Sequence, residues 1–215
     1  MCFSPAASFT ASALLGVTGI AAVMKTKDKK ALPLAMIPIF FAIQQAIEGG
    51  LWLSLRGDGT HTLLLTSLYL FFALFWWPAY GPITIYMVEI VPWRRRVLAI
   101  LSCVGILVGG YVYTTYLIQP IPATIVNHCI YYDHVTPYAM VAAVLYLIAT
   151  LGAGIISSKY ILKFLYTLLA VFAFIAWKIY LNNFASVWCF FAAIASTIIY
   201  FVVTRPLPKK KGTKK

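Results

Sequence analysis

The sequence predicts an all-α integral membrane protein with seven transmembrane helices, and three observations support that prediction. Hydrophobic residues make up 62% of the 215 positions and charged residues 10%, whereas soluble domains carry about 25% charged residues. Apolar segments of roughly 20 residues, enough to cross a ~30 Å hydrocarbon core, recur along the chain. Lysine and arginine cluster between alternate segments. We therefore expect one bundle of short-looped spans, with no room for a soluble catalytic domain.

The spans follow one another with short connections. We expect them at 6–24, 32–55, 62–90, 97–118, 137–157, 161–179 and 184–204, forming a single bundle over 1–204 that is followed by a basic tail at 205–215. With seven spans, the basic clusters all fall on one side, and the positive-inside rule places that side in the cytoplasm. The N-terminus is then outside and the C-terminus cytoplasmic.

The basic clusters account for the net charge of +12 without nucleic acid as a partner. A basic soluble protein would point to nucleic acid, but here the charges follow the expected topology. The clusters lie at 25–30, 94–96, 159–163 and 205–215. We expect them to contact anionic lipids at the cytoplasmic face of the membrane.

The first and third spans carry local signals. The first starts at Ser4-Pro5, where serine suits the N-cap and proline the first helical turn. Lysines follow this span instead of preceding it, so we do not expect it to be a cleavable signal peptide. The third is longer than one crossing and holds two prolines and a glycine over 77–82. Because proline removes a backbone donor, two interpretations stay open: an ordinary kink, or a helix break of the kind that marks binding sites in transporters.

The second span carries the most informative residue, Glu48. A carboxylate at membrane depth is costly unless it is paired, protonated or hydrated, so it is a functional-site hypothesis by default. Gln44 lies on the same helical face, four residues away, and Gln45 lies one position round. We predict Glu48, Gln44 and Gln45 as candidate catalytic residues. The alternative is a structural polar clamp between helices.

Side chains that bind metals concentrate on the predicted outer side. The longest outer loop, 119–136, contains His128 and Cys129, and Cys2 lies near the outer N-terminus. Cysteine, histidine and carboxylate side chains together suit Zn, Cu or Fe. Cys2, Glu48 and His128 therefore form a candidate site for a transition metal or a haem-type cofactor. A disulfide between Cys2 and Cys129 is the alternative in an oxidising compartment.

Aromatic residues are dense in the outer half of the spans, where most of them fit the interfacial belt of a membrane protein. Tyr113 and Trp188 are predicted instead to line a pocket beside Glu48, as candidate cofactor-binding residues. Lys178 ends the sixth span on the same side and either snorkels to the interface or pairs with Glu48. Near the inner interface, Glu89 is expected to form a surface ion pair.

Two segments resemble an uncharacterised family of small bacterial integral membrane proteins. The chain opens with Met-Cys-Phe-Ser-Pro-Ala-Ala-Ser-Phe over 1–9 and carries Gln-Gln-Ala-Ile-Glu-Gly-Gly-Leu-Trp over 44–52. Members of the family begin Met-Cys-Phe-Ser-x-x-Ala-Ser-Phe and carry a Gln-Gln-x-x-Glu-Gly-x-x-Trp segment. The resemblance covers the first two spans and implies a protein of the bacterial inner membrane. It adds interest to Cys2 and Glu48 and supplies no activity.

Three functions are compatible with these features. The one we favour is a metal- or cofactor-dependent membrane enzyme or redox protein with an outward-facing pocket, because cofactor-type side chains concentrate on one side. A proton- or cation-coupled transporter or channel would use Glu48 as its ion site. A membrane sensor or assembly factor would present the outer loop to a ligand and the tail to a cytoplasmic partner.

Overall fold

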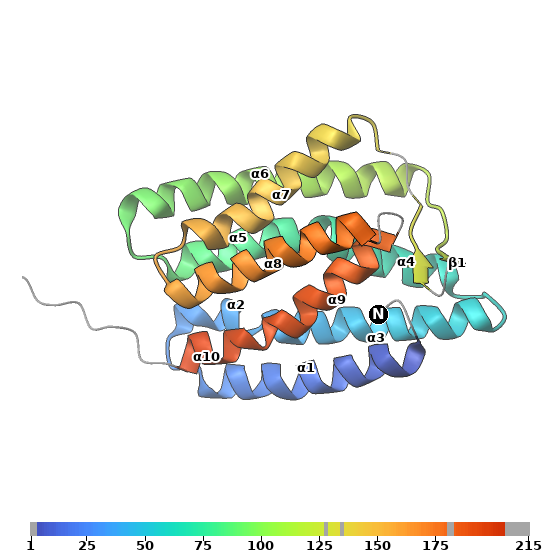
Figure 1. Cartoon of the computed structure of the whole chain (residues 1–215), viewed down its shortest axis with the longest axis horizontal. Coiled ribbons are helices and arrows are strands. Elements are labelled where there is room, and N and C mark those ends of the chain that lie inside the picture. The colour runs from blue at the N-terminus through green and yellow to red at the C-terminus, as the bar shows by residue number, and fades with distance from the viewer. Residues whose placement is uncertain (1–3, 127–128, 134–135, 180–182, 205–215) are drawn as a thin grey trace, which may run out of the picture.

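Seven helical segments that are long and apolar enough to cross a membrane run alongside one another in the computed structural model (Figure 1), within the residues that it describes. The structure describes residues 4–126, 129–133, 136–179 and 183–204. The spans are Pro5–Lys25, Lys29–Arg56, Thr62–Val88, Pro92–Ile118, Ala139–Ile156, Tyr160–Ile179 and Phe184–Thr204. The prediction of an all-α membrane protein with seven spans is confirmed, and each span overlaps the range expected from the sequence.

Three of the spans are built from more than one helical element. The elements in chain order are α1 (Pro5–Lys25), the 3-10 helix η1 (Lys29–Ala31), α2 (Leu32–Ala35), α3 (Ile37–Arg56), α4 (Thr62–Leu70), the π-helical segment η2 (Phe71–Trp76), α5 (Trp77–Val88), α6 (Pro92–Ile118), α7 (Ala139–Ile156), α8 (Tyr160–Ile179), α9 (Phe184–Ser196) and α10 (Ile198–Thr204). The start of α1 is as predicted: the Ser4 hydroxyl accepts a hydrogen bond from the Ala7 N–H at 3.2 Å, and proline occupies the first turn.

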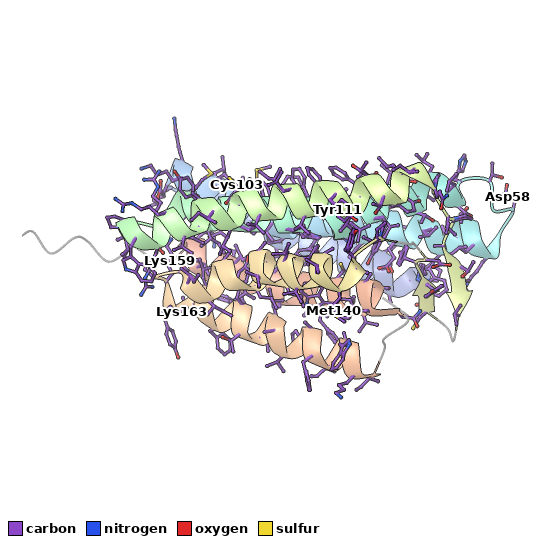
Figure 2. The ribbon with its side chains drawn as sticks, turned by 90° about the horizontal axis from the view of Figure 1, so that it is seen from above. Asp58, Cys103, Tyr111, Met140, Lys159 and Lys163 are labelled. Atoms are coloured by element: carbon purple, nitrogen blue, oxygen red, sulfur yellow. The ribbon has the colours of Figure 1, made fainter. Side chains whose placement is uncertain are left out.

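The two ends of the bundle differ. At one end, which we call the hairpin end, the connection between α6 and α7 contains an antiparallel hairpin of β1 (Thr124–Val126) and β2 (Cys129–Tyr131), with Ile125 opposite Ile130. At the other, which we call the basic end, α1 finishes and the connection between α7 and α8 carries Lys159. Figure 2 shows Lys159 and Lys163 toward the basic end and Asp58 at the hairpin end.

The third span is continuous, so its prolines do not break it. The chain passes from α4 through η2 into α5, and Pro82 lies inside α5. The wide turns of η2 end at Trp76, two residues before Pro78, which has no N–H to give to a carbonyl one turn earlier. The hydroxyl of Tyr146 in α7 donates to the freed carbonyl of Ala73 at 2.6 Å. A side chain from a neighbouring helix thus satisfies backbone polarity inside the span.

Two glycines of α6 let this irregular segment pack closely. A Cβ at Gly105 would overlap the carbonyl of Pro78, and a Cβ at Gly109 would lie 3.0 Å from both the Leu74 carbonyl oxygen and the Pro78 ring. This Gly-x-x-x-Gly spacing places both glycines on one helical face, as in other closely packed membrane helices. It explains how α5 and α6 approach each other at the backbone.

Glu89 locks two connections together at the basic end, so the expectation of a surface ion pair is wrong. The Glu89 side chain is only 3% exposed. Its Oε1 accepts from the N–H groups of Ile90 and Val91, each at 2.9 Å, and its Oε2 accepts from the N–H of Ser158 at 2.7 Å. Burial opposes ionisation of Glu89, but these backbone hydrogen bonds outweigh it and lower the pKa of the carboxyl group.

Arg94 reinforces the same junction without contacting Glu89. Its guanidinium donates to the carbonyls of Ile156 and Ser157, at 3.2 and 2.8 Å, where α7 ends and its last carbonyls lack helical partners. Burial lowers the pKa of the nearby Lys159, and the charges of Asp28 and Glu89 act in the opposite direction. Three connections of the basic end therefore lie within electrostatic range of one another.

Candidate functional site

Polar side chains from three helices meet around Glu48 in the interior of the bundle. We call this cluster the Glu48 centre; it comprises Gln44, Gln45 and Glu48 of α3, Trp77 of α5, and Ser186 and Cys189 of α9. Gln44, Gln45, Glu48 and Ser186 are completely buried. Because buried polar groups are costly unless they are hydrogen-bonded, the bonds inside this centre decide what it can do.

Two side chains of the described residues donate hydrogen bonds to the Glu48 carboxylate. The Ser186 hydroxyl donates to Oε1 at 2.6 Å, which joins α3 to α9, and the Gln45 amide donates to Oε2 at 3.2 Å. Glu48 lies eight residues before Arg56, the last residue of α3, which corresponds to about 12 Å at 1.5 Å per residue. The carboxylate is therefore at membrane depth, closer to the hairpin end of α3 than to its start.

Gln44 joins α3 to α5. Its Oε1 accepts from the indole N–H of Trp77 at 2.7 Å. Phe41, one turn earlier, stacks on the same indole with ring centroids 3.8 Å apart. The spacing of residues 41, 44, 45 and 48 thus brings one face of α3 against α5 and α9, as the helical period requires.

Two buried amide atoms of the Glu48 centre, Gln44 Nε2 and Gln45 Oε1, have no hydrogen-bond partner among the described residues. For both glutamines, the hydrogen bond that the amide makes determines which end of it is the oxygen and which the nitrogen. An indole N–H only donates, so Trp77 must meet the oxygen of Gln44; a carboxylate only accepts, so Glu48 must meet the nitrogen of Gln45. The centre therefore presents one unused donor and, beside the carboxylate, one unused acceptor.

Cys189 borders the unused donor. The side chains of Gln44 and Tyr69 lie within hydrogen-bonding reach of its sulfur, but sulfur is a weak acceptor and does not satisfy the amide. Tyr69 donates to the Ala185 carbonyl at 3.4 Å, and its ring stacks on Tyr132 with centroids 4.5 Å apart. This stack joins α4 to the segment that follows β2, next to the Glu48 centre.

Two cavities meet at Cys189. A cleft of about 740 Å³ lies between α7, α8 and α9 on the hairpin side, and a cavity of about 60 Å³ lies deeper in the bundle and extends to Ser196 and Ile199. Tyr146, Trp188 and Cys189 line both. A volume of about 60 Å³ is enough for a few waters, since one water needs roughly 10–15 Å³ on this measure. Both cavities therefore reach the Glu48 centre at Cys189, and the smaller one also at Trp77.

The two predicted aromatic residues occupy different places. Trp188 lines both cavities, and its indole N–H donates to the Leu169 carbonyl at 3.3 Å. Tyr113 lines neither cavity; its hydroxyl donates to the Ser67 carbonyl at 3.3 Å on α4. Lys178 lies over the ring of Trp177, with its nitrogen 4.8 Å from the centroid. That position favours snorkelling over a pair with Glu48.

The predicted metal ligands are described only in part. Cys2 and His128 lie outside the described residues, so the structure places Glu48 alone of the three. In the described part of the chain, no three side chains of His, Cys, Asp or Glu come together as a metal site. Cys129 is a buried thiol in β2, and the alternative disulfide that would join it to Cys2 involves a residue outside the described part of the chain.

Three members of the Glu48 centre, Trp77, Ser186 and Cys189, were not predicted from the sequence. Ser186 follows the start of the last span and has no periodic signal by itself, and a cysteine inside an apolar helix is more often a small packing residue than a ligand. One general indication was available from the sequence: a buried carboxylate needs a hydrogen-bond donor, and a serine in another span is a plausible one.

Gly49 allows α1 to pack closely against α3, because a Cβ at Gly49 would lie 2.8 Å from the Phe9 ring of α1.

Comparison with known protein families gives one match. A family model described as "Family of unknown function (DUF6629)" matches residues 1–213. The match covers nearly the whole chain, and the chain therefore belongs to this family. Searches of curated proteins and of solved structures find no match.

Proposed function

We propose that this member of the DUF6629 family is a multi-pass protein of the bacterial inner membrane whose Glu48 centre binds a small cation. In this proposal the hairpin end faces outward and the basic end faces the cytoplasm. The positive-inside rule supports that orientation, because the connections at the basic end carry the lysine and arginine clusters.

One observation carries the cation proposal. The carbonyl oxygen of Gln45 is buried beside the Glu48 carboxylate and has no donor among the described residues. Carboxylate and amide oxygens are the ligands that hard cations take in proteins. A bound cation would supply the missing partner of the amide oxygen. The Ser186 hydroxyl and the Gln45 amide would hold the carboxylate in position, as outer-shell partners do in metal sites.

The first candidate for the cation is a metal ion held by Glu48 together with Cys2 and His128. Thiolate and imidazole ligands would shift the preference from a hard cation toward a transition metal or a haem-type cofactor. Gln44 and Gln45 would then orient the site, and the aromatic residues Tyr113 and Trp188 would shield it. This arrangement is the outward-facing pocket of a metal- or cofactor-dependent membrane protein.

Elemental analysis of the purified protein tests the metal proposal. The protein is purified without chelator, incubated with Zn, Cu or Fe, and desalted; we expect about one metal ion per chain in the wild type. Glu48→Gln and His128→Ala should lose the metal, and the control Glu89→Gln should keep it. A wild-type protein that retains no metal under these conditions contradicts the metal proposal.

A second candidate is proton- or cation-coupled transport through Glu48. The 60 Å³ cavity favours it, because this cavity begins at Cys189, beside the Glu48 centre, and extends toward Ser196 and Ile199 in the basic half. Flux measured in proteoliposomes should be lost in Glu48→Gln and kept in Glu89→Gln. Equal flux in Glu48→Gln and wild type argues against a transport role for the carboxylate.

A further inference from the structure

The 740 Å³ cleft is a wedge between α7 and α8 that opens toward the hairpin end. Near the basic end the two helices touch: a Cβ at Gly154 would overlap the ring of Tyr166. Both figures show α7 and α8 separating from that contact toward the hairpin end. Small side chains line the facing sides of the wedge; they are Ala139, Ala142, Ala143, Ala170 and Ala173. These alanines leave space between the two helices, although larger side chains such as Met140, Leu147 and Phe174 also line the wedge.

The surroundings of the wedge identify the chemistry of its occupant. It is bounded by spans that cross the hydrocarbon core, and its lining is apolar, with aromatic rings from Phe174, Trp177 and Trp188. Its volume is within the range of about 300–1,000 Å³ that holds small-molecule ligands in proteins. Side chains that face an unfilled apolar space lose dispersion contacts. Lipid tails are as apolar as leucine and are the medium next to this wedge.

A positive charge lies near the mouth of the wedge. Trp177 is half exposed and lines it, and the ammonium group of Lys178 lies 4.8 Å from the centroid of the Trp177 ring. Lys178 is in the last turn of α8, at the level where headgroups meet the hydrocarbon. This charge complements a phosphate group attached to a chain that enters the wedge.

We propose that the wedge between α7 and α8 holds one acyl chain of a membrane phospholipid, with the lipid phosphate beside Lys178. The proposal depends on the wedge and on Lys178, and it does not require a cation at the Glu48 centre. Since Cys189 lines the wedge, the end of the chain reaches the side of α9 that borders that centre.

Native mass spectrometry of the full-length protein in mild detergent tests the proposal. With added phosphatidylglycerol, the wild type should retain one phospholipid per chain. Ala173→Phe, which places a ring in the wedge, should lose it, whereas Val171→Phe on the exposed face of the same helix should keep it. Ala143→Phe fills the wedge from α7 and provides a second test if Ala173→Phe does not fold. Lys178→Gln should weaken retention.

Tryptophan fluorescence in vesicles gives an independent measurement. Phosphatidylcholine brominated along its acyl chain should quench Trp177 and Trp188 in the wild type, and the quenching should fall in Ala173→Phe but not in Val171→Phe. Equal lipid retention and equal quenching in these two variants overturn the proposal. A wild type that retains no lipid and whose wedge is covered in a dimer, seen as twice the mass in native spectra, overturns it as well.

Glu48→Gln separates this proposal from the cation proposal. We expect Glu48→Gln to retain the phospholipid even where it loses the cation. Loss of lipid in this variant, with the wild-type fold intact, contradicts the independence of the two sites.

Discussion

Glu48 and Glu89 are both buried carboxylates, 0% and 3% exposed, but their partners differ. Glu89 accepts from three backbone N–H groups, which occupy both of its oxygens and tie two connections together. Glu48 accepts from the side chains of Gln45 and Ser186, and two amide atoms beside it lack partners among the described residues. Burial alone therefore does not identify a functional carboxylate.

The type of partner is the more informative property. Backbone donors are held in place by the fold, so a carboxylate that accepts hydrogen bonds from several of them stabilises the fold, as a helix-capping side chain does. Side-chain donors can turn away to accommodate a ligand, and unused polar atoms mark a site where a ligand adds bonds. On this comparison Glu89 is a structural lock, and Glu48 is the carboxylate that we propose as a binding residue. The following predictions test that distinction.

The largest stability effect is expected at Glu89. Glu89→Ala removes the acceptor of three backbone N–H groups, and we expect the free energy of unfolding to fall by about 3 kcal/mol. Glu89→Gln, which keeps one acceptor oxygen, should lose less. The measurement is the unfolding midpoint in detergent, followed by intrinsic fluorescence. If Glu89→Ala has the same unfolding midpoint as the wild type, Glu89 does not stabilise the fold and the comparison with Glu48 fails.

Glu89 should also make the unfolding midpoint depend on pH in acid. We expect this effect on stability to be smaller than that of Glu89→Ala. The folded-state pKa of Glu89 is lowered from its ordinary value of 4.5 by backbone hydrogen bonds that outweigh burial. Its contribution to stability is therefore complete above about pH 4.5 and is lost as the pH falls through the folded-state value. The unfolding midpoint of Glu89→Gln should depend less on pH below 4.5 than that of the wild type. Parallel pH profiles of the two proteins contradict this assignment.

A smaller effect is expected at the donor of Glu48. Ser186→Ala removes a hydrogen bond between α9 and α3, and interhelical bonds in membrane proteins average about 0.6 kcal/mol. The matched control is Ser196→Ala in the same helix, whose hydroxyl donates to the Ala193 carbonyl one turn earlier and so joins no second helix through that bond. We expect Ser186→Ala to lower the unfolding midpoint slightly and Ser196→Ala to leave it unchanged. A loss in Ser186→Ala as large as in Glu89→Ala indicates a structural clamp at Glu48.

Most of the fold was predictable because it depends on hydropathy and length. The seven spans, the cap at Ser4 and the grouping of Gln44, Gln45 and Glu48 follow from local pattern. The partners of Glu48 were not predictable, because Ser186 lies 138 positions away and long-range pairing leaves no local signal. Glu89 was misassigned because adjacent arginines suggest an ion pair, whereas the tertiary fold offers backbone donors. The hairpin of β1 and β2 was also missed, since strands of three residues are too short to show a period.

The most direct test of the central claim is the bound metal content of Glu48→Gln, measured together with its unfolding midpoint. Glutamine is nearly isosteric, and its amide can still accept from Ser186, so we expect the midpoint to change by less than the equivalent of about 1 kcal/mol. The account predicts that this variant loses the metal that the wild type binds while its midpoint stays within that limit. A midpoint that falls as far as in Glu89→Ala, with the metal content unchanged, would show that Glu48 is a structural clamp and contradict the account.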